Sequence, residues 1–337
     1  MRPPSGTGVF GFAAIRALPL FLLFVLGGGL AALPAFPNKD ERPYRVAVDV
    51  NLVVLHATVT DREGHLVSGL RRDDFHVYED GAAQQITLFQ HEDIPVTVGL
   101  VVDHSGSMRP KLRDVMAAAD TFARASNPDD QMFVVNFNEA VSFGLPAGVP
   151  FTGNASLLED AIFHSATTGK TALYDAIVES LHRLQQGTRR KKVLIVISDG
   201  GDNASRCDLH QAVQQAEESN AIIYTIGLLD QNDSDRNPKV LKRLARLTGG
   251  EAFFPDETGE VVGICRRIAE DIRSQYTLGY VPAVPPTDST YRTIRVMARA
   301  PHRGRLLVRT RTGYVPMVGT PPAGQPPAGP ASEGHGR

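Results

Sequence analysis

The sequence has no tryptophan, and aromatic residues make up only 7% of its 337 residues. Proteins that bind single-stranded nucleic acid usually stack the bases on aromatic side chains, so this scarcity argues against a base-stacking surface. Charge is nearly balanced as well, since 35 Lys and Arg oppose 37 Asp and Glu for a net charge of −2. A chain with this balance has no overall attraction for polyanions. We therefore expect no nucleic acid among its partners.

Cysteine is also scarce, because only Cys207 and Cys265 occur. Two cysteines cannot form a disulfide framework, and without a neighbouring cluster of His and Cys they do not form a zinc site. Two free thiols are the expected state. A single Cys207–Cys265 disulfide stays an alternative if the protein is exported to an oxidising compartment.

Residues 1–35 have the composition of a secretory signal peptide. Arg2 and Arg16 supply a basic start, an apolar run follows over residues 17–33, and small residues stand near Ala35. We expect cleavage of this segment and export of the protein, either to the periplasm or out of the cell. The alternative is an uncleaved N-terminal anchor, and only then would the protein contact a membrane.

Residues 94–276 alternate apolar, β-branched runs with stretches of helical periodicity. The runs over residues 96–102 and 193–197 show no polar alternation, which is typical of strands that are buried on both faces. Strands that alternate with helices indicate a parallel sheet with helices on both sides. We predict a doubly wound, mostly parallel α/β sheet flanked by helices, with residues 141–143 as a short antiparallel partner strand.

The flanks of this region, residues 44–92 and 277–315, are rich in β-branched residues and turn signals. A few short strands on their own make a poor core, so we predict that both flanks combine into one β-sandwich-like accessory domain. Residues 316–337 are rich in Pro and Gly, the composition of a disordered tail.

Seven arginines and no acidic residue occur over residues 292–311. This stretch is either a solvated sheet face or a surface for an acidic partner or anionic polysaccharide.

The stretch that carries chemistry follows the apolar run at 96–102. Asp103, Ser105 and Ser107 alternate there on a turn, with Gly106 allowing a tight backbone. Ligand sites in open α/β sheets lie at the carboxyl ends of the strands. Carboxylate and hydroxyl oxygens are the donors that Mg²⁺ and similar hard cations prefer. The turn is therefore a candidate cation site.

Two later stretches complete a recognisable pattern. Gly169-x-Thr171-x-Leu173 opens a helical stretch, and Asp199-Gly200 follows the apolar run at 193–197. Together with Asp103-x-Ser105-x-Ser107 they resemble the metal-ion-dependent adhesion site (MIDAS) of von Willebrand factor type A (VWA) domains. The closing Arg311-x-Gly313-Tyr314 strand and the β flanks resemble bacterial secreted proteins with VWFA-related domains, and this resemblance spans residues 45–315.

The resemblance implies a ligand set, a cofactor and a partner. The cation would be Mg²⁺, with Mn²⁺ or Ca²⁺ as alternatives, and an Asp or Glu carboxylate of a partner protein would complete its coordination. Five side chains would bind the cation: Asp103, Ser105, Ser107, Thr171 and Asp199.

Other interpretations of single residues stay open. Thr171 can cap the helix that follows it, and Asp202 can support the site behind its ligands or cap the next helix, which is the preferred interpretation. A phosphate loop at Gly169-Lys170-Thr171 would need a glycine where His164 stands. The run Asp230–Asp235 alternates oxygen side chains but lacks the Gly and Glu of a calcium loop. We expect neither a nucleotide nor such a loop.

Three classes of function remain, and we favour an exported, metal-dependent protein-binding module. A metal-assisted hydrolase is the first alternative, but it needs a general base. His104 alternates away from Asp103 and Ser105, and no Gly-x-Ser-x-Gly elbow occurs. The sequence therefore predicts no enzyme. A metal-free structural protein of the cell envelope is the second alternative.

Overall fold

The computed structural model describes residues 52–163, 167–229 and 236–316, which belong to one compact unit, Asp49–Arg337. The expected signal peptide, the tail from residue 317 and the run Asp230–Asp235 lie outside the described residues. In the described ranges no helix is both long and apolar enough to cross a membrane.

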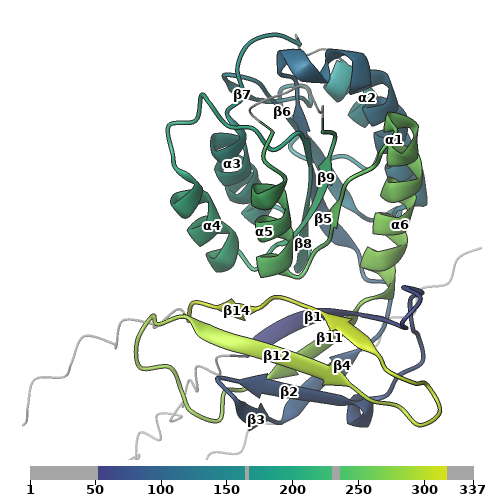
Figure 1. The fold of residues 1–337 in the computed structure, drawn as a ribbon, viewed down its shortest axis with the longest axis vertical. Coiled ribbons are helices and arrows are strands. Elements are labelled where there is room, and N and C mark those ends of the chain that lie inside the picture. Colours follow the sequence, from purple (N-terminus) through teal and green to yellow (C-terminus); the bar gives the residue numbers. More distant parts are fainter. Residues whose placement is uncertain (1–51, 164–166, 230–235, 317–337) are drawn as a thin grey trace, which may run out of the picture. The chain divides into compact units, whose positions relative to one another are not determined.

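A six-stranded sheet in the order β10-β9-β8-β5-β6-β7 forms the centre of the structure (Figure 1). All pairs are parallel except the pairing of the last strand, β7, with β6. The strands in sheet order are β10 (Ala252–Phe253), β9 (Ile222–Gly227), β8 (Lys191–Ser198), β5 (Val96–Asp103), β6 (Gln131–Phe137) and β7 (Val141–Phe143).

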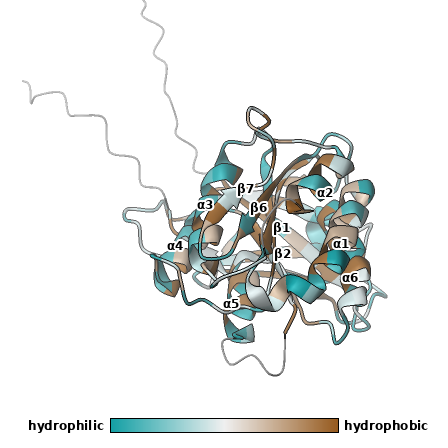
Figure 2. Ribbon diagram, turned by 90° about the horizontal axis from the view of Figure 1, so that it is seen from above, coloured by the Kyte–Doolittle hydropathy of each residue, from teal (hydrophilic) through white to brown (hydrophobic). Residues whose placement is uncertain are grey.

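Helices cover both faces of this sheet, as the fully apolar runs require. Every residue of β5 and β8 is buried, which a one-sided sheet would not allow. One face packs against α1 (Leu112–Ala125), α2 (Ala155–Phe163) and α6 (Val261–Ser274). The other packs against α3 (Leu173–Gln185), α4 (Leu209–Glu218) and α5 (Pro238–Thr248). Hydrophobic residues lie towards the sheet, and hydrophilic ones on the outward helix surfaces (Figure 2).

Local sequence signals explain where the helices begin and end. In α1 the buried residues Val115, Ala118, Ala119 and Phe122 follow the three- and four-residue spacing of one helix face. Helix α5 starts with a proline in its first turn and ends at Gly249, whose φ of 85° favours glycine.

Two four-stranded sheets are built from both flanks, in the orders β13-β1-β11-β4 and β14-β12-β2-β3. The first pairs the N-terminal β1 with the C-terminal β11, and the second pairs β2 with β12. Their facing sides bury a shared apolar core that includes Leu55, Val77, Tyr276 and Leu278. The strands are β1 (Val53–Thr60), β2 (Phe75–Glu79), β3 (Ala82–Gln84), β4 (Ile86–Gln90), β11 (Tyr276–Tyr280), β12 (Arg292–Ala298), β13 (Leu307–Arg309) and β14 (Gly313–Tyr314). The predicted fold class is confirmed: a mostly parallel α/β sheet with extra strands from the flanks.

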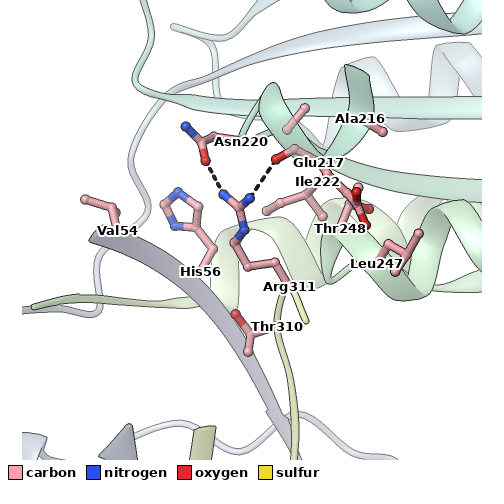
Figure 3. A pocket seen from close by; sticks show the side chains of 11 residues that line it. Val54, His56, Ala216, Glu217, Asn220, Ile222, Leu247, Thr248, Thr310 and Arg311 are labelled. Carbon is pink, nitrogen blue, oxygen red and sulfur yellow. Dashed lines mark hydrogen bonds between the residues drawn. The ribbon is translucent and has the colours of Figure 1, made fainter. Parts of the chain in front are cut away.

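The closing segment that contains Arg311-x-Gly313-Tyr314 is divided between the two flanking sheets. Residues 305–314 do not form one strand, because β13 pairs with β1 in one sheet and β14 pairs with β12 in the other. The chain crosses between the sheets at Arg311, whose guanidinium donates to the Glu217 carbonyl at 2.7 Å and to the Asn220 side chain near the end of α4 (Figure 3). The crossing ties the flanking strands to the central α/β unit.

The structure also shows the state of the two cysteines and the contacts of the arginines over residues 292–311. Cys207 and Cys265 are free thiols, so the alternative disulfide is not formed.

The arginines of residues 292–311 do not all have the same surroundings. Arg292 pairs with buried Glu79, and Arg309 pairs with Asp271 and Glu251, whereas Arg295 and Arg299 are exposed. The stretch is therefore solvated at Arg295 and Arg299 and engaged in ion pairs at Arg292 and Arg309.

Candidate metal centre

The ends of β5 and β8 bring four of the predicted residues together. Asp103 is the last residue of β5, and Ser198 ends the neighbouring β8. The Ser107 hydroxyl donates to Asp199 Oδ2 at 2.7 Å, and Ser105 Oγ lies 3.2 Å from Ser107 Oγ. Since adjacent parallel strands end at the same edge, residues far apart in sequence meet here.

Asp103 is anchored through both carboxylate oxygens. Its Oδ1 accepts from the backbone N–H of Ser105 at 2.8 Å, and its Oδ2 accepts from the Ser198 hydroxyl at 2.7 Å. The Gly200 N–H donates in turn to Ser198 Oγ at 3.0 Å. Ser198 was not among the predicted site residues. Its place as the last residue of an apolar strand, next to Asp199, is the signal that could have identified it.

Burial dominates the electrostatics of Asp103. Taking the carboxylate out of water raises the pKa of Asp103 from 3.8 to about 6, and the charge of Asp199 adds to this, although hydrogen bonds from Ser105 and Ser198 oppose it. Within the described ranges neither Asp103 nor Asp199 forms an ion pair with Lys, Arg or His. The site thus concentrates negative charge, and no Lys, Arg or His of the described residues pairs with it.

Thr171 lies on a loop that is fixed to the segment after Asp199. Its N–H donates to Asn203 Oδ1 at 2.9 Å, and its carbonyl accepts from the N–H groups of Asn203 and Ala204 at 2.9 and 3.1 Å. These contacts hold the loop of Thr171 beside the loop of Asp199. Among the described side chains, the Thr171 hydroxyl is not hydrogen-bonded to the other four predicted ligands. Asn203 is a second residue that the sequence did not single out.

Asp202 has a role that differs from the preferred interpretation. It does not cap α4, the helix after it, because Asp208 does so in a capping box with Gln211. Asp202 Oδ2 instead accepts from the N–H of Tyr174 in the first turn of α3 at 2.9 Å. It therefore caps the helix that follows Thr171, and Thr171 does not. The Asp202 carboxylate thereby connects the loop after Asp199 to the loop that carries Thr171 at the start of α3.

Asp175 reinforces the same connection. Burial alone would raise its pKa, but hydrogen bonds from Arg206 and Cys207 outweigh burial and lower the pKa of Asp175 to about 2. The backbone N–H groups of these two residues each lie 3.0 Å from its carboxylate. The segment after Asp199 is therefore held to the start of α3 by several independent hydrogen bonds.

The donor set fits a hard divalent cation. Two carboxylates and several hydroxyls face one edge, and hydroxyls retain acceptor lone pairs while they donate. Nowhere in the described ranges do three or more His, Cys, Asp or Glu gather as a metal cluster. A cation at this edge would therefore depend on Ser and Thr hydroxyls as well as on Asp103 and Asp199.

The residues considered for catalysis or nucleotide binding lie elsewhere. His104 is fully buried, and its Nε2 lies 3.1 Å from Asn136 Oδ1 on β6. Its ring therefore faces Asn136 on β6. The segment before Gly169 follows helix α2, which ends at Phe163, whereas a phosphate loop follows a strand. His164 lies outside the described residues.

The fold and these loops define an α/β domain with an oxygen-rich site at the carboxyl edge of its parallel sheet. Residues 97–264 match the family model of the von Willebrand factor type A domain. The chain therefore carries a VWA domain over these residues. No curated protein matches the chain.

Several solved structures are similar to this chain. A von Willebrand factor type A protein from Catenulispora acidiphila has 14% identity and a TM-score of 0.49, over 79% of this chain and 74% of that one. The vWF domain of the type V pili tip protein Mfa5 from Porphyromonas gingivalis has 15% identity and a TM-score of 0.45, over 53% and 95%. The PilB minor pilin from Streptococcus sanguinis has 12% identity and a TM-score of 0.41, over 55% and 62%.

Proposed function

We propose that this protein is an exported, metal-dependent protein-binding module. Asp103, Ser105, Ser107, Thr171 and Asp199 would hold the cation, which we take to be Mg²⁺, with Mn²⁺ or Ca²⁺ as alternatives. The observation that carries the proposal is the pair of carboxylates, Asp103 and Asp199, which are joined through hydroxyls and form no ion pair with a Lys, Arg or His of the described residues. VWA domains are in general interaction modules rather than enzymes, which agrees with this choice.

The residues of the site are suited to holding a cation without neutralising it fully. Asp103 and Asp199 contribute two negative charges, and the hydroxyls of Ser105, Ser107 and Thr171 add none. When bound, the cation would supply a positive centre that attracts a carboxylate of the partner. Ser107 can donate its proton to Asp199 and still offer lone pairs. Asp202 and Asn203 would keep the Thr171 loop in place from behind.

Thermal unfolding of the full chain tests the cation. We expect Mg²⁺ or Mn²⁺ to raise the unfolding midpoint relative to chelator, because a ligand that binds only the folded state adds about 2.7 kcal/mol at 100 times its dissociation constant. Asp103→Asn should abolish this response, and Glu270→Gln, an exposed change on α6, should preserve it. If the unfolding midpoint of the wild type is the same with metal and with chelator, the proposed cation site is refuted.

A capture experiment then tests the partner. The full chain is used as bait for proteins of the cell envelope, with Mg²⁺ or with chelator, and with wild type or Asp103→Asn. A partner that contributes a carboxylate should be retained only by wild type in Mg²⁺. Loss of binding after Asp→Asn or Glu→Gln changes in that partner would identify the carboxylate. Retention that is equal in chelator would remove the metal from the binding mechanism.

Export rests on the pattern of residues 1–35 alone. The expected outcome is that the mature chain, recovered from cells, lacks this segment when its N-terminus is sequenced. An intact N-terminus in the membrane fraction would instead support the anchored alternative.

A further inference from the structure

Three adjoining hollows lie where α4 and α5 face β12, β13 and β14. One of about 440 Å³ lies between α5 and the edges of β12 and β13. A second of about 560 Å³ continues over the outer side of β12. A third of about 750 Å³ lies between α4, α5 and the residues that flank β14, Thr312 and Val315. The first shares Ile294 and Arg295 with the second, and Arg246 and Thr312 with the third. Because they share these residues, the three hollows together form one groove. Figure 1 shows the ribbon of α5 above the ribbons of β14 and β12.

Basic side chains line this groove and lack ion-pair partners. Lys242 and Arg246 come from α5, and Arg295 and Arg299 come from β12. All four are exposed, and none forms an ion pair within the described ranges. Arg309 lines the same groove but differs, because Asp271 and Glu251 bind it.

The sequence explains why these cations lack acidic partners, although Lys242 Nζ lies 5.0 Å from the centre of the Phe254 ring. Helix α5 carries two more basic residues, Lys239 and Arg243, and no acidic one, so no Glu or Asp stands one turn away to pair with them. Residues 292–311 have no acidic residue either. Of the acidic residues beside the groove, Glu251 already pairs with Arg267 and Arg309, and Glu217 and Glu218 lie only in the hollow next to α4.

The floor of the groove is suited to an extended chain. Ile294, Val296 and Val308 line the 440 Å³ hollow, and Ile294 and Val296 reach it from the apolar core between the flanking sheets. Strand β12 pairs with β14 only at Arg292 and Thr293. The Ile294 N–H still donates to the Thr312 carbonyl at 2.8 Å. From Arg295 to Ala298 the strand pairs with β2 alone, so this part of its other edge has no partner strand among the strands that the structure describes. An extended peptide can hydrogen-bond to such an edge.

We propose that this groove binds an extended acidic segment of a partner protein, with carboxylates on Lys242, Arg246, Arg295 and Arg299 and apolar side chains on the floor. A peptide is favoured over an anionic polysaccharide because the floor combines aliphatic side chains with an unpaired strand edge, and only a polypeptide has a backbone that matches such an edge. The groove is separate from the candidate metal centre, and this proposal does not depend on it.

A synthetic peptide of alternating Glu and Val, labelled with fluorescein, is the probe. Fluorescence anisotropy with the full chain should show binding that weakens as salt is added, and a Lys and Val peptide should not bind. The double variant Arg246→Glu with Arg295→Glu should weaken binding at least about tenfold. The double variant Arg62→Glu with Arg113→Glu reverses two exposed charges outside the groove, and its affinity should stay within about twofold.

Further measurements separate the explanations. Chelator and Asp103→Asn should leave peptide binding unchanged, so failure of the metal proposal would not affect this result. Thermal midpoints establish that the variants fold, and Arg246→Gln with Arg295→Gln replaces the double reversal if its midpoint falls. Equal loss in both double variants, or loss on adding chelator, would overturn the proposal. Preferential binding of heparin or of anionic lipid vesicles over the peptide would also overturn it.

Discussion

At the scale of single residues, the most consequential group is the carboxylate of Asp103. The residue is fully buried, and water no longer stabilises its charge. Its hydrogen bonds come from a serine hydroxyl and a backbone N–H, which are neutral donors. They compensate only in part, and the pKa of Asp103 stays raised at about 6. Without a cation, the ionised form of Asp103 therefore destabilises the fold.

The direction of its pH dependence follows from this shift. Because the folded-state pKa of about 6 exceeds the usual 3.8, the folded protein binds more protons than the unfolded chain between these values. The free energy of unfolding should therefore fall as the pH rises from about 4 to about 6. At 1.36 kcal/mol per pKa unit, the cost at neutral pH is on the order of 3 kcal/mol.

We predict that Asp103→Asn stabilises the protein in chelator at pH 7 to 8, because the amide keeps hydrogen-bonding capacity without the charge. Near pH 4 the two proteins should have similar free energies of unfolding, since Asp103 is then protonated in the folded state. Urea unfolding at several pH values measures the difference. A variant that is less stable than wild type at every pH would contradict this account. In Mg²⁺ the order should reverse if the cation binds.

At the scale of elements, Asp271 on α6 joins the central sheet to the flanking strands. Its carboxylate accepts from Thr58 Oγ on β1 at 2.6 Å and from the Tyr224 hydroxyl on β9 at 2.8 Å. Arg309 on β13 forms an ion pair with the same oxygen as Tyr224. Burial, assisted by the charge of Asp271, raises the pKa of Tyr224 well above 10. This buried network links α6 to three strands.

Removing this carboxylate should therefore be costly. We predict that Asp271→Ala lowers the free energy of unfolding by about 3–5 kcal/mol, because it leaves two buried hydroxyls, of Thr58 and Tyr224, without their acceptor and leaves Arg309 with Glu251 as its one carboxylate. The neighbouring Glu270 is exposed, and Glu270→Ala should change stability by less than about 0.5 kcal/mol. Chemical denaturation of both variants measures the difference. Similar values for the two would show that the network contributes little.

The closing motif acts at the same scale. Arg311 binds the end of α4, and a Cβ on Gly313 would lie only 2.3 Å from the Arg292 carbonyl oxygen. The Tyr314 hydroxyl donates to Glu79 at 3.1 Å, and the Tyr280 hydroxyl donates to it at 2.6 Å. Each residue of the closing motif therefore contacts a different element: Arg311 contacts α4, Gly313 packs against β12, and Tyr314 binds Glu79 of β2.

At the scale of the whole molecule, the two flanks depend on each other and on the central unit. Strand β1 comes from the N-terminal flank and β11 follows α6, yet they pair over Val53–Ala57 and Tyr276–Tyr280. The chain thus enters and leaves the VWA domain through one β layer. Neither flank retains a complete sheet without the other.

We predict that the central unit and the flanking sheets unfold in one cooperative transition. All α-helices of the described residues lie between Leu112 and Ser274, whereas Tyr276, Tyr280 and Tyr314 lie in the flanking sheets. Helical circular dichroism and near-ultraviolet tyrosine signals therefore report mainly on different parts. With two-state unfolding their urea midpoints should coincide. Separate midpoints would show that the flanking sheets form an independent domain.

Local sequence patterns predict much of this architecture. Apolar runs such as residues 193–197 define buried strands because both faces must be covered. Asp103 and Asp199 follow two such runs, and the carboxyl ends of parallel strands share one edge, so their proximity could be predicted. The structure brings Asp103, Ser105, Ser107 and Asp199 within one hydrogen-bonded group. Their role as metal ligands stays a prediction.

Other features were decided only by the tertiary structure. Asp202 caps α3 rather than α4, Ser198 binds Asp103, and the closing segment divides between two sheets at Arg311. Each of these contacts joins residues that lie far apart in the sequence. A carboxylate, a hydroxyl or a guanidinium can hydrogen-bond with many different partners, so the residue type does not select one. The sequence alone determined the strands, the helices and the edge where the site lies. Folding selected the partners, because only packed elements fix which donor reaches which acceptor.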